Sequence, residues 1–190
     1  MRVLIINSSP RREGNISRML RRAIEVVTAA GAEYTEINLY DKEIRQCVGC
    51  MACRTNLSCP IKDDMPEIAR AIKDADRIVI GAPCYWANMP GVLKTMFDRL
   101  AYLFIAEGDR NFPKPLLKGR KALVIATATT PMPFARLFGQ TSGTVKSIHR
   151  ILRMGGIKTI PSIQIGGTMK RDVTDSDLRR VDRRMTKLLK

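Results

Sequence analysis

No stretch of the sequence has the ~20 consecutive apolar residues that a membrane-spanning helix needs. The apolar stretch near the start of the chain, residues 3–6, is too short for the hydrophobic region of a signal peptide. Histidine occurs once, at His149 on a predicted amphipathic helix, where we expect a packing or surface role. No Ser-His-Asp or Cys-His arrangement is recognisable. These absences predict a cytoplasmic protein that does not enter a membrane and is not a hydrolase.

Acidic residues are also few: 18 aspartates and glutamates stand against 33 lysines and arginines, giving a formal charge of +15. Such a charge favours anionic partners, namely phosphorylated cofactors, an acidic redox protein or nucleic acid. Nucleic acid is not expected, because only 5% of the residues are aromatic, the basic stretches contain none of them, and no nucleic-acid-binding signature occurs. The alternative is that the cations of the first and last predicted helices are solvated faces that keep the protein soluble.

Strand and helix signals alternate along the whole chain. Strands are predicted at residues 2–7, 33–39, 76–81, 121–127 and 157–165. Helices are predicted at residues 16–30, 65–73, 90–100, 143–154 and 174–189. Strands that alternate with helices form a parallel sheet covered on both faces, so we predict an α/β fold with five parallel strands.

Two connections are longer than this rhythm requires. Residues 40–63 form a cysteine-rich insertion, and residues 127–140 contain two prolines. Long loops in compact domains are often functional. We expect residues 1–190 to form a single domain that carries the cysteine-rich insertion.

The first predicted strand runs directly into a polar loop, residues 8–17, which precedes the first helix. Open α/β sheets bind ligands at this carboxyl edge, and the helix start adds free N–H groups and a positive dipole end. Serines, Asn15 and Arg11 add hydrogen-bonding groups and charge, so the loop is predicted to hold a phosphate. It is neither a GxGxxG nor a Walker loop. The alternative is a polar loop in which Asn15 caps the helix.

A second loop, residues 81–91, follows the third strand and contains the only tryptophan, Trp86, next to Tyr85. It offers aromatic faces, apolar edges and backbone donors to a flat heteroaromatic ring. The alternative is an apolar plug over the end of the sheet.

Together the two loops resemble those of the NAD(P)H-dependent FMN reductase family. Residues 8–15 (SSPRREGN) are similar to that family's phosphate loop, and residues 82–99 to its flavin-ring loop and following helix. The resemblance implies a flavodoxin-like three-layer sandwich of strand order 2-1-3-4-5, with FMN bound across the switch point. FAD is not expected, because the loop ends at a monophosphate site.

By position, the resemblance implies three groups of FMN-binding residues. The phosphate-side residues are Ser9, Arg11, Asn15, Ile16 and Ser17. The ring-side residues are Pro83, Cys84, Tyr85, Trp86, Asn88 and Met89. The residues at the other edge of the ring are Thr127, Ala128, Thr129 and Thr130. This sequence departs from the family at Ser8, where the family has glycine, and at Ile16, where it has threonine. The loop after the fourth strand also lacks the expected glycines, and Ser17 is expected to replace the missing hydroxyl.

Four cysteines follow the spacing Cys47-x2-Cys50-x2-Cys53-x5-Cys59-Pro60, which resembles the cysteine run of ferredoxins. Four thiolates can hold a [4Fe–4S] cluster, and zinc is the other metal that four sulfurs suit. With the following Asp63-Asp64-Met65, the run resembles the iron–sulfur flavoproteins. Because cluster-free FMN reductases keep several of these cysteines, a redox or structural thiol group is the alternative. Cys84 is expected to stand apart from this set.

The resemblance implies an FMN-dependent oxidoreductase that passes electrons between a donor, a [4Fe–4S] cluster and FMN. One alternative is a cluster-free NAD(P)H-dependent FMN or quinone reductase, with NAD(P)H as donor. The other alternative is a non-catalytic flavodoxin-like electron carrier or a basic binding protein. The expected partners are a small molecule or a redox protein such as an acidic ferredoxin, and further copies of the chain in a homodimer or homotetramer.

Overall fold

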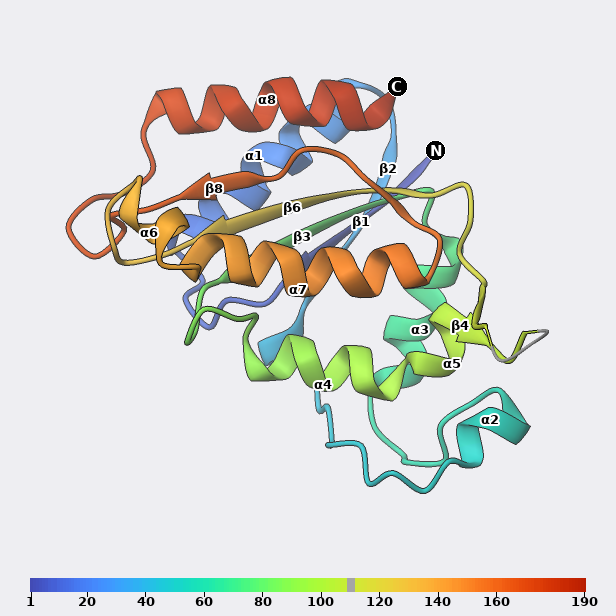
Figure 1. The fold of residues 1–190 in the computed structure, drawn as a ribbon. Helices are drawn as coiled ribbons and strands as arrows, with labels where there is room; N and C mark the ends of the chain where they lie inside the picture. The colour runs from blue at the N-terminus through green and yellow to red at the C-terminus, as the bar shows by residue number, and fades with distance from the viewer. Residues whose placement is uncertain (109–111) are drawn as a thin grey trace.

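The computed structural model describes residues 1–108 and 112–190, which form an α/β sandwich of three layers (Figure 1). The middle layer is a parallel sheet in the order β2-β1-β3-β6-β7, and β8 also pairs with β6. Its strands are β1 (Arg2–Asn7), β2 (Glu33–Asn38), β3 (Arg77–Pro83), β6 (Lys121–Thr127), β7 (Lys158–Thr159) and β8 (Ile163–Ile165). The predicted 2-1-3-4-5 order is confirmed, with β6 as the fourth strand and β7 and β8 sharing the fifth position.

The fifth strand is interrupted, which corrects the prediction of one strand over residues 157–165. Thr159 pairs with Ala122 and Ile163 pairs with Ile125, so three residues on this edge lie opposite two on β6. The extra residue makes a bulge that contains Pro161. Proline cannot donate to a strand ladder and is confined to edges and bulges. The apolar pattern predicted the strand but did not reveal the bulge.

Helices cover both faces of the sheet. Helices α1 (Asn15–Ala29) and α8 (Asp175–Leu189) lie on one face, and α3 (Met65–Asp74), α4 (Gly91–Arg99) and α7 (Gln140–Met154) lie on the other (Figure 1). Alternate residues of β1 serve the two cores: Val3 and Ile5 belong to the α1 side, and Leu4 and Ile6 to the opposite side. Each fully buried side chain of this kind stabilises the fold by roughly 1.5–3 kcal/mol.

Several short elements have no signal in the sequence pattern. They are the 3₁₀-helix η1 (Leu39–Asp41), α2 (Ala52–Asn56), α5 (Ala101–Phe104), α6 (Phe134–Leu137), and the antiparallel pair β4 (Ile105–Ala106) and β5 (Lys114–Pro115). Two-residue strands are too short to show an alternating pattern. Within the described ranges, no helix combines the length and the apolar character needed to cross a bilayer.

Candidate functional site

Three loops meet at the carboxyl edge of the sheet. Asn7, at the end of β1, pairs with Gly81 of β3, and Pro83 at the end of β3 pairs with Thr127 at the end of β6. The loops that follow these strands therefore start side by side, as predicted from the strand pattern. The backbone amide of Cys84 continues the ladder by donating to the carbonyl of Thr127 at 2.8 Å. Two of the loops were predicted to hold a phosphate and a flat ring, and the third to close the ring's other edge.

The first loop is tied to the end of β3 by Ser8. Its backbone N–H donates to the carbonyl of Gly81 at 3.0 Å, and its hydroxyl donates to the same carbonyl at 2.7 Å. Gly81 itself allows α1 to approach the sheet closely, because a Cβ there would lie 2.6 Å from the Cγ2 of Ile16. The serine that departs from the family's glycine thus fixes the loop to the neighbouring strand.

The N-terminus of α1 leaves backbone amides free for an anion. Its N-cap residue is Gly14, and no side chain of the described residues caps it. Asn15 lies inside the helix rather than at its cap. Its amide group donates to the carbonyl of Arg171 at 3.3 Å and accepts from the backbone of Val173 at 2.8 Å. The first N–H groups of a helix have no partner within it, so those of α1 are available to a ligand.

The side chains of the phosphate loop divide into engaged and available groups. The Ser17 hydroxyl donates to the carbonyl of Arg11 at 2.8 Å and accepts from Asn7 at 3.0 Å, so its one proton stabilises the loop. Ile16 is buried in the core, which leaves only its backbone to a ligand. The hydroxyl of Ser9 accepts from the Arg11 amide at 3.2 Å and retains its own proton for donation. The guanidinium of Arg11 is exposed. Ser9, Arg11 and the helix amides are therefore the free donors.

The ring-side loop ends in a tight two-residue turn. Tyr85 and Asn88 exchange backbone hydrogen bonds of 3.0 Å, and the two residues between them, Trp86 and Ala87, have φ values of 52° and 57°. Turns of this kind normally contain Asn-Gly, because side chains are disfavoured at positive φ. Trp86 is 100% exposed in the isolated chain. Strained backbone beneath an exposed aromatic ring is typical of a site that meets a ligand or a partner.

The third loop closes the same edge. Thr127 and Ala128 are buried, whereas Thr129 is exposed and Thr130 is half-buried. The carbonyl of Ala128 accepts from Thr168, and that of Thr130 accepts from Gly167 at 2.8 Å. This loop is thus held by backbone bonds in the place where the family's glycines were expected.

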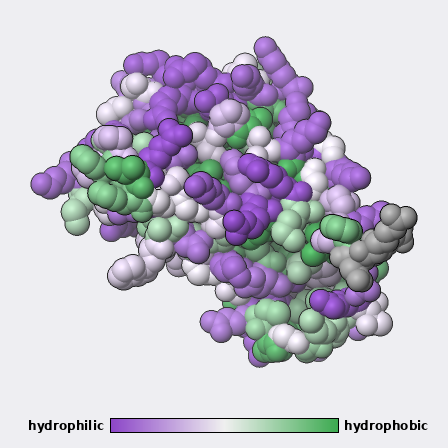
Figure 2. Space-filling view, in the orientation of Figure 1, coloured by the Kyte–Doolittle hydropathy of each residue, from purple (hydrophilic) through white to green (hydrophobic). Residues whose placement is uncertain are grey.

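Helix α6 follows the third loop and presents an apolar surface. Phe134, Leu137 and Phe138 are 51%, 75% and 66% exposed, and the two phenylalanine rings stack with centroids 6.1 Å apart. Figure 2 shows an apolar area in the region that α6 occupies in Figure 1. Exposed apolar patches of this kind mark contact surfaces.

The cysteine-rich segment lies on the side of α4 that faces away from the sheet (Figure 1). Cys47 and Cys50 are exposed, and Cys53 and Cys59 are half-buried; all five cysteines, Cys84 included, are free thiols. Over residues 1–108 and 112–190, no three metal-ligating side chains are grouped to hold an ion. The donor set nevertheless suits a cluster chemically, because four thiols lie within thirteen residues and ligands commonly converge only on binding metal. The predicted ligand set stays a prediction.

One functional candidate escaped the sequence analysis. Arg99 of α4 is completely buried and forms an ion pair of 2.7 Å with Asp63. Burial alone would raise the pKa of Asp63, but hydrogen bonds from Arg99 and from the amides of Arg45 and Met65 outweigh it and hold that pKa below its usual value. The Nε of Arg99 also donates to the sulfur of Cys59 at 3.1 Å. An arginine on the buried face of an amphipathic helix is the signal that could have revealed it.

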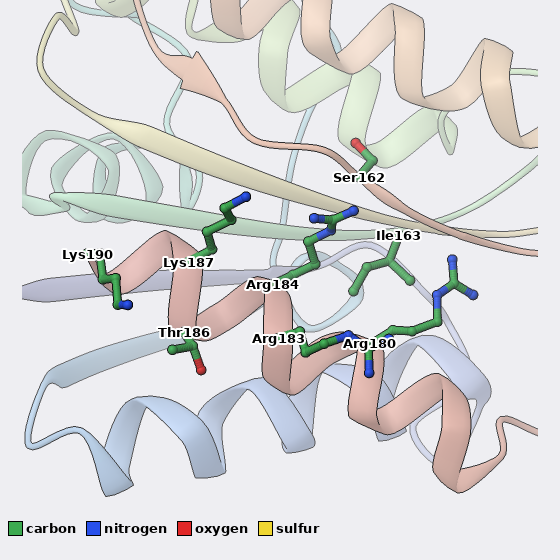
Figure 3. A pocket seen from close by; sticks show the side chains of 8 residues that line it. All are labelled: Ser162, Ile163, Arg180, Arg183, Arg184, Thr186, Lys187 and Lys190. Carbon is green, nitrogen blue, oxygen red and sulfur yellow. The ribbon is translucent and has the colours of Figure 1, made fainter.

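A basic groove lies elsewhere on the surface, beside the bulged sheet edge (Figure 3). Its volume is about 470 Å³. It is lined by Ser162, Ile163, Thr186 and five cations, of which Arg180, Arg183, Arg184 and Lys187 belong to α8 and Lys190 follows it. Ser162 also bonds His149 at 2.9 Å, and burial followed by the charge of Arg153 lowers the pKa of that histidine. Helix α8 and the cysteine-rich segment lie at opposite ends of the molecule as Figure 1 shows it.

Comparison with known proteins identifies the family. A family model described as a flavodoxin-like fold matches residues 1–189. The chain belongs to this flavodoxin-like family. The flavodoxin-like chain is 37% identical to an iron–sulfur flavoprotein of Methanosarcina thermophila over 157 residues, which cover 83% of this chain and 75% of that one. An iron–sulfur flavoprotein of Methanocaldococcus jannaschii is 40% identical over 111 residues. That match spans only 58% of each of the two chains.

A solved structure agrees with the fold. The FMN-dependent NADH-azoreductase of Bacillus anthracis, determined in complex with FMN, superimposes with a TM-score of 0.78 at 20% identity. The superposition covers 100% of this flavodoxin-like chain and 99% of the other. At this identity the likeness establishes the fold alone. The predicted resemblance to flavodoxin-like FMN reductases, and to iron–sulfur flavoproteins among them, is confirmed.

Proposed function

We propose that this protein is an FMN-dependent oxidoreductase. The observation that carries the proposal is the meeting of three loops at the carboxyl edge of the sheet, with the free amides of α1 at one end and the Tyr85–Asn88 turn nearby. Open α/β sheets bind nucleotide cofactors at this edge. The azoreductase that shares the fold is FMN-dependent, and relatives above 30% identity are named iron–sulfur flavoproteins.

The chain's own groups fit a flavin mononucleotide. The amides of α1, the Ser9 hydroxyl and the Arg11 guanidinium supply donors and positive charge for one phosphate. Pro83, Cys84 and the Tyr85–Asn88 turn would lie along the ring, and Thr127–Thr130 would close its other edge. When bound, FMN supplies the exchange between two-electron and one-electron transfer. The protein orients the ring and limits its contact with water.

The cysteine-rich segment adds a [4Fe–4S] cluster to this proposal. Cys47, Cys50, Cys53 and Cys59 would be its ligands, and the cluster would supply single electrons to the flavin or accept them from it. The spacing and the names of the relatives support this assignment. A cluster-free NAD(P)H-dependent FMN or quinone reductase is the second candidate, and it is supported by the name of the FMN-dependent NADH-azoreductase that shares the fold.

We further propose a homodimer or homotetramer in the cytoplasm. Trp86 and the apolar residues of α6 are exposed next to the flavin loops, where a second copy would cover them. Free thiols persist in a reducing compartment. The electron donor or acceptor would be a small molecule or a redox protein, and the positive charge suits an acidic ferredoxin.

One preparation tests the cofactor assignments. Protein purified without oxygen is assayed for iron, sulfide and heat-released flavin, and its visible spectrum is recorded. FMN with about four irons per chain supports the first candidate. FMN without iron, even after reconstitution, supports the cluster-free reductase. FAD as the main flavin, or no flavin at all, contradicts the proposed function.

A further inference from the structure

Arg99 holds an unusually complete set of partners for a buried cation. Its side chain is 0% exposed. Nη1 donates to the carbonyl of Arg45 and to Asp63, each at 2.7 Å, and Nη2 donates to Asp63 at 3.1 Å and to the carbonyl of Ile61 at 3.4 Å. Nε donates to the sulfur of Cys59 at 3.1 Å. All five N–H groups of the guanidinium are therefore used.

These partners come from both ends of the cysteine-rich segment. Arg45 precedes the first cysteine, whereas Ile61 and Asp63 follow the last one. The Asp63 carboxylate ties the two ends further, because it also accepts from the backbone amide of Arg45 at 3.0 Å. These contacts hold the two ends of the cysteine-rich segment together. They also attach the segment to α4, the helix that follows the ring-side loop.

Joining the two ends of the segment would not by itself require a buried ion pair and a hydrogen bond to a sulfur. A buried ion pair stabilises a fold no better than apolar side chains of similar volume in many proteins, so stability alone does not account for its presence here. Asp63 balances the charge of Arg99 and takes two of its five N–H groups. The Nε–H group points away from this pair to a sulfur. That sulfur belongs to Cys59, which is half-buried, whereas Cys47 and Cys50 are exposed.

A hydrogen bond to a ligand sulfur has a defined electronic effect. It withdraws negative charge from the sulfur, and so stabilises the reduced, more negative form of an iron–sulfur cluster relative to the oxidised form. The reduction potential of a cluster held by that sulfur would therefore be higher. No proton or ligand is transferred.

We infer that Arg99 is a positioning residue for Cys59: with Asp63 it fixes this sulfur at the base of the segment, and its Nε–H group raises the reduction potential of a cluster bound there. The second part rests on the proposed iron–sulfur function. The first part concerns the chain itself and holds with or without the cluster.

The test compares Arg99→Lys with a matched control, Arg54→Lys. Lysine keeps the positive charge but cannot serve Asp63 and Cys59 together. Arg54 lies in the same segment but is 62% exposed, with its nearest carboxylate at 3.8 Å. A double variant, Arg99→Met with Asp63→Asn, removes both buried charges and guards against a folding failure of the single variant. FMN content and circular dichroism confirm that each variant is folded.

The first readout needs no cluster. Iron-free protein is treated with an alkylating reagent, and the modification rate of each cysteine is followed by mass spectrometry. We expect Cys59 to react at least about fivefold faster, relative to Cys47, in Arg99→Lys and in the double variant than in wild type or Arg54→Lys. Equal relative rates in all four proteins would overturn the positioning role.

The second readout is the midpoint potential of the reconstituted cluster, measured by an anaerobic redox titration followed by electron paramagnetic resonance. If the hydrogen bond stabilises the reduced form about tenfold more than the oxidised form, its loss lowers the one-electron potential by about 59 mV. An unchanged potential in Arg99→Lys would overturn the electronic role. If wild-type protein takes up no cluster, the proposed iron–sulfur function fails, and the alkylation rates alone decide whether Arg99 holds Cys59.

Discussion

Replacement of Arg11 by alanine tests where the flavin phosphate binds. The change removes an exposed side chain but leaves the loop intact, because the backbone of Arg11 makes the structural contacts. Its amide donates to Ser9 at 3.2 Å, and its carbonyl accepts from Gly14 at 3.1 Å and from Ser17 at 2.8 Å. No side-chain partner of Arg11 occurs among the described residues. The effect of the substitution is therefore confined to the ligand.

The expected loss follows from one charge-assisted hydrogen bond. Such a bond contributes roughly 1.5–3 kcal/mol, which corresponds to a roughly ten- to hundredfold or greater increase in the Kd for FMN. Because the arginine is exposed, screening by solvent places the expected value near the lower limit. Fluorescence quenching of FMN, titrated at two salt concentrations, measures the Kd, and the difference should shrink at higher salt.

Arg183→Ala in the basic groove is the matched control. It removes the same charge from α8, so any change in the general field of the protein is reproduced without touching the loop. We expect its Kd for FMN to lie within about twofold of wild type. Equal losses in the two variants would show that the phosphate does not bind at the N-terminus of α1.

Three other predictions concern the cysteines, the ring-side turn and the buried ion pair. Serine replacement of any one predicted ligand should deplete iron but retain FMN, whereas Cys84→Ser should retain both; iron and flavin assays decide this. The predicted ligands are Cys47, Cys50, Cys53 and Cys59. Trp86→Gly relieves a positive φ, so it should leave the stability of the monomeric chain unchanged or raise it by up to ~1 kcal/mol while FMN binding weakens; a loss of stability that does not depend on protein concentration would contradict an exposed Trp86, whereas a concentration-dependent loss would place Trp86 in the proposed contact between copies. Asp63→Asn should cost about 3–5 kcal/mol at neutral pH. Since the pKa of Asp63 is lowered in the fold, its contribution is present above the ordinary value of 3.8 and disappears as the pH falls below it, so denaturant unfolding of the two proteins should converge there.

The sheet and its order were predictable because their signals are local. Each buried strand is a short apolar run, and each crossover is a helix of ordinary length, so handedness and neighbour relations follow from general rules. Residues 121–127 were predicted with the boundaries that β6 has. The bulge at Pro161 and the β4–β5 pair were missed, because they depend on which strand lies opposite and not on the pattern of their own residues.

The candidate site was predicted in position but less well in detail. The strand ends placed the three loops together, and motif resemblance assigned them a cofactor. Hydrogen-bond partners, however, come from residues distant in sequence. The Ser17 hydroxyl, expected to face a phosphate, donates to Arg11 within its own loop, and Asn15 bonds a segment more than 150 residues away. A sequence lists donors without revealing which of them the fold already uses.

Arg99 links the two halves of the proposed electron path. Helix α4 begins directly after the ring-side loop and ends at Arg99. The guanidinium of Arg99 donates hydrogen bonds to Arg45 and Asp63, at the two ends of the cysteine-rich segment. Its buried residues Leu93, Met96 and Phe97 pack in the core beneath the sheet, so the helix is fixed along its length. A rigid helix fixes the distance between the groups at its two ends. Helix α4 therefore joins the ring-side loop to Cys59 within one chain, whereas Cys47 and Cys50 lie exposed between the two ends that Arg99 holds. If the segment binds the proposed cluster, its four predicted ligands would have to converge on the metal, as ligands of metal sites commonly do on binding.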